Sequence, residues 1–245
     1  MKKTYLSLFA FSVALSLLAI GCTKNSSPTP TDTSAQMAFA MQSDNALATL
    51  ASGNGSVGGG LTTFAATSTA SVAWTTATAN ISKFKFEAKK AGVAFEVVSS
   101  GLVNVDLFAT LPSTINATIV NGTYTNVELH VVLAKSTTTT LPFVLKGTYT
   151  TKAGNTVPIE FDFNDDAEIV AVANDLTIDG KTNLLAKVSL HLSQLLANVS
   201  AQEIDQTVRT NNTILITSAI NPTVYNKIKT DLMLSGGSTI VTTAK

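Results

Sequence analysis

The chain of 245 residues contains two histidines and one cysteine, so little imidazole or thiol chemistry is available to it. His130 follows Glu128 by two residues in a segment that predicts a strand, which places both side chains on the polar face about 7 Å apart. Such a pair meets on a metal only with help from elsewhere in the fold. His191 also falls on the polar face of a predicted strand. We expect both histidines to be exposed surface residues, with a metal or acid–base role as the alternative.

The most acidic stretch follows a predicted strand and contains Asp162, Asn164, Asp165, Asp166 and Glu168. Oxygen ligands gathered at a strand end suit Ca²⁺. However, the stretch lacks the Gly and Glu that an EF-hand loop requires at its sixth and twelfth positions, which excludes that kind of site. We expect a solvated turn whose acids protect against aggregation. Asp162, Asp165 and Asp166 remain weak candidates for an irregular calcium site, and otherwise no metal is predicted.

Two sequence patterns associated with cofactors or catalysis give no support for a site in this chain. Gly53, Gly55 and Gly58 match G-x-G-x-x-G, but no strand precedes them, no helix follows and no acidic residue lies about twenty positions on. Residues 53–60 therefore predict a flexible Gly-rich loop, and the role of residues 46–70 stays unassigned. No serine lies in G-x-S-x-G. We accordingly predict no catalytic residue, no cofactor and a protein that is not an enzyme.

Four aromatic side chains could stack on a sugar or a peptide, namely Trp74, Tyr124, Tyr149 and Tyr225. The single Trp of a β-sandwich is more often a core anchor, and Tyr225 lies on the apolar stripe of a predicted helix. We expect these rings in the core and retain a ligand platform as the alternative. The sequence does not assign ligand-binding residues.

The N-terminal segment predicts a lipoprotein signal peptide over residues 1–21. Lys2 and Lys3 precede an apolar stretch that ends at Cys22, the only thiol of the chain. The stretch is short of the ~20 residues that span a bilayer. It resembles a bacterial lipobox, in which cleavage before the cysteine allows acylation of its thiol, although Ala19 stands where the lipobox favours Leu. Cys22 is thus the predicted lipidation site, and the lipid bilayer is the predicted partner.

Residues 22–35 are polar and contain proline, which predicts an extended tether between the lipid and the folded part. Removing Lys2 and Lys3 leaves the mature chain slightly acidic, because the whole chain carries 16 basic and 16 acidic residues. This balance excludes a polybasic membrane arm and indicates no nucleic-acid partner. With 45% hydrophobic and only 13% charged residues, the chain is also unlike an intrinsically disordered protein.

Residues 36–245 predict one β-sandwich domain. Apolar residues alternate with polar ones in five segments: Met37, Phe39, Met41; Phe84, Phe86; Val103, Val105, Leu107; Val127, Leu129, Val131, Leu133; and Val157, Ile159, Phe161, Phe163. Turn signals at residues 90–92, 121–122, 153–155 and 179–180 separate such segments. Strands at this spacing without long intervening helices favour antiparallel sheets.

Two helices are predicted near the C-terminus. Asn221 and Pro222 supply an N-cap and a first-turn proline for a helix that Gly236 and Gly237 end, and its buried stripe contains Val224, Tyr225, Ile228 and Leu232. Ser200 and Glu203 form a capping box for a shorter helix that carries Ile204 and Val208.

Several strand patterns resemble those of uncharacterised envelope lipoproteins of bacteroidete-type bacteria. They are Trp74-Thr75-Thr76, Ile81 to Lys89, Val105-Asp106-Leu107-Phe108 and Gly122-Thr123-Tyr124. The resemblance covers residues 74–234 and implies a lipid-anchored, prealbumin-like β-sandwich in the outer envelope. It brings no activity and no functional residues.

Together these patterns predict a non-enzymatic, lipid-anchored binding or scaffolding module of the outer membrane. An envelope protein or a glycan is the expected partner. Thr23 to Ser27 contains no acidic residue of the kind that accompanies surface export in these bacteria, so we expect the domain to face the periplasm. The alternatives are a pilus-type subunit that assembles by strand exchange and a surface adhesin that binds glycans.

Overall fold

A computed structural model describes residues 33–44, 47–50 and 69–243, which all belong to a compact unit that begins at Asp32. The predicted signal peptide, Cys22, most of the predicted tether and the Gly-rich loop 53–60 lie outside the described residues. The first strand begins at Ser34, and Ala35 is buried within it. The folded domain therefore starts two residues before the expected boundary at Gln36.

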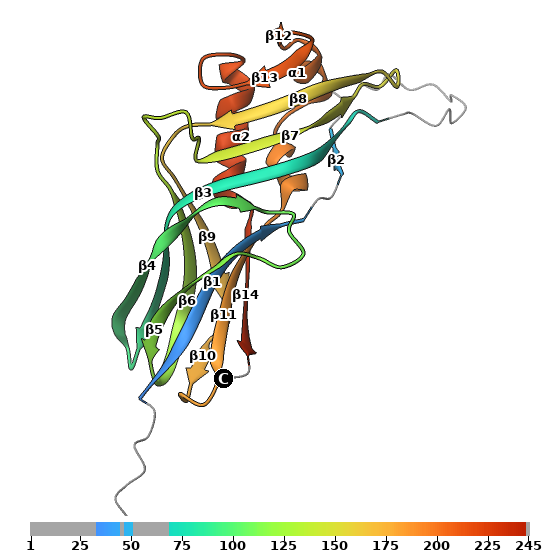
Figure 1. The fold of residues 1–245 in the computed structure, drawn as a ribbon. Helices are drawn as coiled ribbons and strands as arrows, with labels where there is room; N and C mark the ends of the chain where they lie inside the picture. The colour runs from blue at the N-terminus through green and yellow to red at the C-terminus, as the bar shows by residue number, and fades with distance from the viewer. Residues whose placement is uncertain (1–32, 45–46, 51–68, 244–245) are drawn as a thin grey trace, which may run out of the picture. The chain divides into compact units, whose positions relative to one another are not determined.

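The described chain is mainly β and forms two sheets (Figure 1). The smaller sheet has four strands, in the order β14 (Gly236–Thr243), β11 (Asn183–Leu190), β1 (Ser34–Ser43) and β5 (Thr114–Val120).

The larger sheet has ten strands, and its long central strand β3 (Ser71–Lys90) pairs with four of the others. The main path runs β10 (Leu176–Ile178), β6 (Gly122–Leu133), β3, β7 (Phe143–Thr150), β8 (Thr156–Phe163), β13 (Thr213–Ile216) and β12 (Arg209–Thr210). Off this path, β2 (Ala48–Thr49) and β4 (Val93–Asp106) pair with β3, and β9 (Ala167–Ala173) pairs with β6.

The register of β3 is irregular in its pairings with β4, β6 and β7. Its pairing with β4 shifts between Ala79 and Ile81, opposite the segment between Leu102 and Val105. A Cβ atom at Gly101 would lie 1.7 Å from the backbone oxygen of Ile81, so only glycine fits this close approach.

The core lies between the inner faces of the two sheets. Phe39 of β1 stacks on Phe84 of β3 with ring centroids 5.7 Å apart, which joins the smaller sheet to the larger one. In β6, Val127, Leu129, Val131 and Leu133 are all buried, as their alternation predicts. Two inner faces that share one core are the arrangement of a β-sandwich.

The strand pairing is mixed and not wholly antiparallel as expected. β1 runs parallel to β11, and β13 runs parallel to β8. The predicted turn at Asn121-Gly122 does not close a hairpin, because β5 pairs with β1 whereas β6 pairs with β3. Period-two patterns reveal which face is buried, but they contain no information on strand direction or partner.

One predicted face is wrong at its first residue. Val105 and Leu107 are buried, but Val103 is 76% exposed. Asn104 has a φ of 53°, which interrupts the extended backbone and the alternation between them.

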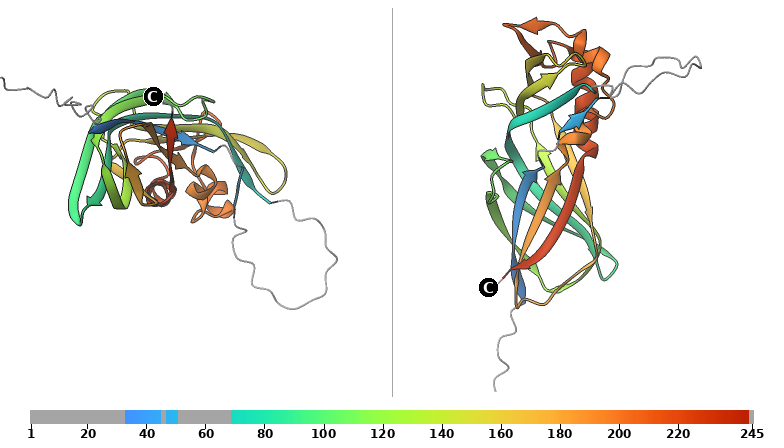
Figure 2. Two further views of the ribbon diagram at one scale, coloured as in Figure 1. Left: turned by 90° about the horizontal axis from the view of Figure 1, so that it is seen from below. Right: turned by 90° about the vertical axis from the view of Figure 1, so that its right-hand side faces the viewer.

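Three helical segments lie against one face of the larger sheet. In the left view of Figure 2, the strands of that sheet curve around them. The helical segments are η1 (Leu192–Leu196), α1 (Ala201–Asp205) and α2 (Pro222–Leu234). The α1 capping box is confirmed, since Ser200 accepts from the Glu203 amide and Glu203 accepts from the Ser200 amide. Ile204 is buried as expected, but Val208 lies beyond the helix and is 67% exposed.

The predicted stripe of α2 is confirmed, because Val224, Tyr225, Ile228 and Leu232 are buried. The ends differ from the prediction. Asn221 occupies the N-cap position with a φ of 59°, but its side chain bonds to Val208 and Leu215 and not to the helix. Gly236 does not merely end the helix; it opens β14, which the sequence pattern did not predict.

Among the described residues, no helix is long and apolar enough to cross a membrane.

Candidate functional site

The outer face of the larger sheet carries charged residues that strand pairing places in rows. Glu87 of β3 pairs directly with Glu96 of β4 on one side and with Glu128 of β6 on the other. In the next row, Lys85 of β3 pairs directly with His130 of β6. Directly opposed like charges destabilise a sheet, so this row of three glutamates requires a local reason.

His130 lies at the centre of this group. Its Nδ1 is 3.0 Å from Oε1 of Glu168, a residue of β9, and the Nζ of Lys85 lies 2.6 Å from the same oxygen. Its Nε2 faces the other way, 3.4 Å from Oε2 of Glu128 and 3.7 Å from Oε2 of Glu87. We call Lys85, Glu87, Glu128, His130 and Glu168 the histidine–carboxylate cluster.

The imidazole of His130 is buried although it belongs to an outer face. Its side chain is only 8% exposed, whereas those of Glu87 and Glu128 are 36% and 45% exposed. The expectation of an exposed surface histidine is therefore wrong for His130. Alternation placed it correctly on the polar face, but side chains from the neighbouring strands β3 and β9 cover the ring.

Lys85 controls the charge of two carboxylates in the cluster. A hydrogen bond from its ammonium group is the main cause that lowers the pKa of Glu168 and of Glu87 below the usual value. Hydrogen bonds to Glu168 and Glu87 in turn raise the pKa of Lys85. The two glutamates are therefore anionic at neutral pH, next to a buried imidazole.

Chemically, the cluster offers one imidazole nitrogen and two carboxylate oxygens that lie within 4.8 Å of one another. The sequence predicted that Glu128 and His130 would meet on a metal only with help from elsewhere but named no third residue; the structure places Glu87 in that position. Glu87 escaped notice because it lies 41 positions before Glu128, and only the register of β3 against β6 brings them together.

His191 has a different setting, just after β11. Its Nδ1 is 2.9 Å from Oδ2 of Asp44, and the other oxygen of Asp44 accepts from the amide of Leu192. The side chain is 42% exposed. These contacts connect the end of β1 to the start of η1, which is a structural role.

The weak calcium candidates are distributed to separate partners. Asp165 accepts from the hydroxyl of Tyr225 and from Lys229, and Lys229 is the main cause that lowers the pKa of Asp165. Asp166 accepts from the amide of Lys135. Burial, followed by the charge of Glu160, raises the pKa of Asp162. Asp165 and Asp166 therefore have separate partners in the turn, whereas Asp162 belongs to β8 and its Oδ1 is buried without a hydrogen-bond partner among the described residues. The three carboxylates are not among the described groups whose ligand atoms converge within 4.8 Å.

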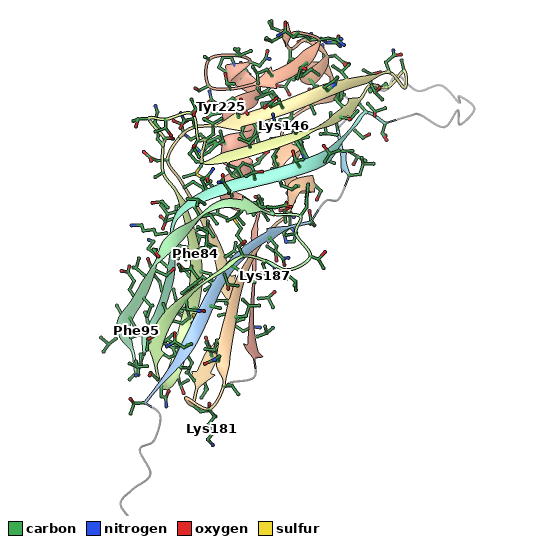
Figure 3. The ribbon with its side chains drawn as sticks, in the orientation of Figure 1. Phe84, Phe95, Lys146, Lys181, Lys187 and Tyr225 are labelled. Atoms are coloured by element: carbon green, nitrogen blue, oxygen red, sulfur yellow. The ribbon has the colours of Figure 1, made fainter. Side chains whose placement is uncertain are left out.

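All four candidate aromatic rings are buried, as the core interpretation predicts. Tyr124 donates to the carbonyl of Val120, and Tyr149 donates to Oδ1 of Asp205. Tyr225 lies on α2 beneath β8 (Figure 3), where it packs against Phe161 and Phe163. These rings therefore do not form a platform for a sugar or a peptide.

A hollow of about 680 Å³ lies beside the start of α2. Its wall includes Val208, Ile220 and Val224 together with the polar Gln206 and Asn221. The charged group at its edge, Glu203, is already paired with Lys227 at 2.6 Å. The hollow has apolar and neutral polar walls, and no set of converging charges marks it for a particular ligand.

Comparisons with protein-family models, with curated proteins and with solved structures find no match to this chain.

Proposed function

We propose that this protein is a non-enzymatic, lipid-anchored binding or scaffolding module of the outer membrane. The observation that carries the proposal is Cys22, the only thiol of the chain, placed directly after an apolar segment that begins with two lysines. Acyl chains on Cys22 would hold the module at the bilayer, since each buried methylene contributes roughly 0.8 kcal/mol.

We further propose that the domain is a prealbumin-like sandwich whose outer face makes the contacts with a partner. The different composition of the inner and outer faces supports this proposal. The aromatic residues fill the shared core, while unusual charge groupings lie on the outer face.

Replacement of Cys22 by Ser tests the anchor. The wild-type protein is expected to incorporate labelled palmitate and to partition into detergent, whereas Cys22→Ser is expected to do neither. Labelled Cys22→Ser protein would overturn the proposal. Ser26→Ala, in the same polar segment, is the matched control and should be labelled normally.

The orientation is proposed to be periplasmic, and protease applied to cells tests it separately. Protease should leave the domain intact on whole cells and digest it once the outer membrane is permeabilised. Digestion on intact cells would reverse the orientation and favour a surface adhesin.

A subunit that assembles by strand exchange is the second candidate, and one observation favours it. β1 lies inside the smaller sheet, with β11 on one side and β5 on the other. Loss of this strand would leave an open groove, and strand addition into such a groove is a known mode of recognition.

A further inference from the structure

We propose that the histidine–carboxylate cluster is a binding site for a divalent transition-metal cation, with Nε2 of His130 and the Oε2 atoms of Glu87 and Glu128 as its ligands. This site is independent of the lipid anchor and would make the outer face of β3, β6 and β9 a cation-dependent surface.

An unpaired ring nitrogen supports a cation at this site. Nε2 of His130 is buried and has no hydrogen-bond partner among the described residues, although two carboxylate oxygens lie 3.4 and 3.7 Å from it. A buried polar atom without a partner costs about 1–3 kcal/mol. A cation between Nε2 and the two oxygens removes this cost and the repulsion between the carboxylates.

The other ring nitrogen of His130 has a partner that suits metal binding. When Nδ1 of His130 donates to Glu168 at 3.0 Å, Nε2 carries the lone pair that a metal needs. Metal-binding histidines commonly have a carboxylate in this position, where it fixes the tautomer and the ring orientation. Glu168 is thus a positioning residue and not a ligand.

The row of like charges across three strands also favours a bound cation. Glu96, Glu87 and Glu128 are directly opposed on three neighbouring strands, and Lys85 neutralises only part of this charge. Its Nζ lies 3.0 Å from Oε1 of Glu87, whereas Oε2 of Glu87 is the atom that faces His130. The lysine and a metal can therefore use different oxygens of the same carboxylate. Lys83 and Lys89, on the same face of β3, are exposed.

The donor atoms and their spacing indicate the class of metal. An imidazole nitrogen favours zinc, iron, nickel or copper over Mg²⁺ and Ca²⁺. In a tetrahedral zinc site with bonds of about 2.0–2.1 Å, neighbouring ligand atoms lie about 3.3–3.4 Å apart. The distances of 3.4 and 3.7 Å from Nε2 are close to this value. The partly exposed glutamates leave room for water as a further ligand.

Calorimetry tests the site. Zinc chloride is titrated into the full chain after the protein has been solubilised in detergent and treated with a chelator. We expect one zinc ion per chain and a loss of affinity of at least about tenfold for His130→Gln and for Glu128→Gln. Glu168→Gln should weaken binding by about tenfold, the lower end of the range for residues that orient a ligand. Lys89→Gln is the matched control, because Lys89 is exposed on the same face of β3 and pairs with Thr125, outside the row of glutamates, and it should bind zinc within about twofold of wild type.

A second measurement keeps the test valid if a variant fails to fold. In the wild-type chain, the nitrogen NMR signal of His130 Nε2 should shift on addition of zinc, while the signals of His191 stay in place. Absence of zinc binding by the wild-type chain would overturn the proposal. Unchanged affinity in a folded His130→Gln variant, or a zinc-induced shift at His191 alone, would also overturn it.

Discussion

Lys85 and Glu168 belong to strands that are not neighbours, yet their side chains meet 2.6 Å apart across the intervening strand β6. Two strand spacings amount to roughly 10 Å, so both side chains must extend over His130 to make this contact. The pair therefore explains why a histidine on an outer face is buried. It also connects three strands on the side of the sheet opposite to the apolar core.

This pair predicts a loss of stability in acid. Lys85 lowers the pKa of Glu168 and Glu87 below their usual value of 4.5, so the stabilisation is complete above that pH and disappears as the pH falls through the lower pKa values of the folded state. The side chains are partly exposed, which limits the contribution to about 1 kcal/mol or less per pair. Urea unfolding at several pH values should show this decline.

The variant Lys85→Met should flatten the acid decline below about pH 4.5, because it removes the main cause that lowers the pKa of the two glutamates in the folded chain. Lys89→Met provides the control, since Lys89 is an exposed lysine of the same strand. An acid decline as steep in Lys85→Met as in wild type would contradict the role given to Lys85.

Tyr149 and Tyr124 allow a comparison between charged and neutral acceptors. Both rings are buried, but Tyr149 donates to the carboxylate of Asp205 at 2.8 Å and Tyr124 donates to a backbone carbonyl at 2.6 Å. Burial, with the bond to Asp205, raises the pKa of Tyr149, so the hydroxyl remains a donor throughout the accessible pH range.

We expect Tyr149→Phe to lower the free energy of unfolding by about 1.5–3 kcal/mol and Tyr124→Phe by about 0.5–1.5 kcal/mol. Urea unfolding monitored by circular dichroism measures both values. The double variant Tyr149→Phe with Asp205→Ala should lose less free energy of unfolding than the two single variants lose together. Full additivity would show that the bond contributes little.

Gly101 of β4 should tolerate an added side chain less well than Gly154, which lies in the turn between β7 and β8. An added methyl group would lie 1.7 Å from the backbone oxygen of Ile81, and no side-chain rotation relieves a clash with backbone. We expect Gly101→Ala to cost more than about 3 kcal/mol, above the usual range for overpacking. Thermal unfolding compares it with Gly154→Ala, where the space is open and a φ of 85° alone costs about 1–2 kcal/mol. Equal losses in the two variants would contradict the close approach of Gly101 to the backbone of Ile81.

The sequence predicted the faces of strands far better than their partners. Alternation identified the buried residues of β6 and β8, because the side-chain period of a strand is a local property. It failed at Val103, where the left-handed conformation of Asn104 breaks the period. The parallel pairing of β1 with β11 joins segments nearly 150 positions apart, and no local pattern encodes such a pairing.

The candidate site shows the same limit. Glu128 and His130 were visible as a pair because they are two positions apart, and Glu168 was visible as part of an acidic stretch. Their meeting with Lys85 and Glu87 depends on the register of β6 with β3 and with β9. The burial of His130 follows from the length of the covering side chains, which the polarity pattern does not report.

The inclusion of β1 within the smaller sheet leads to the last prediction. Met37, Phe39 and Met41 are buried, and β1 forms backbone pairs with both β11 and β5. A chain that lacks residues 34–43 should therefore fail to fold alone, because two strand edges and a groove in the core are left open. Addition of a peptide with the sequence SAQMAFAMQS should restore the strand signal in circular dichroism, as strand addition does in other sheets.

The matched control is a peptide in which Phe39 is replaced by Ser. This change removes the ring that stacks on Phe84 but leaves the backbone of β1 able to pair. The control should restore folding much less well, since truncation of a buried Phe costs about 3–5 kcal/mol. Rescue by the natural peptide alone would support the strand-exchange candidate, because a neighbouring subunit would supply the same contacts. If the truncated chain folds with wild-type stability, β1 is dispensable and that candidate is eliminated.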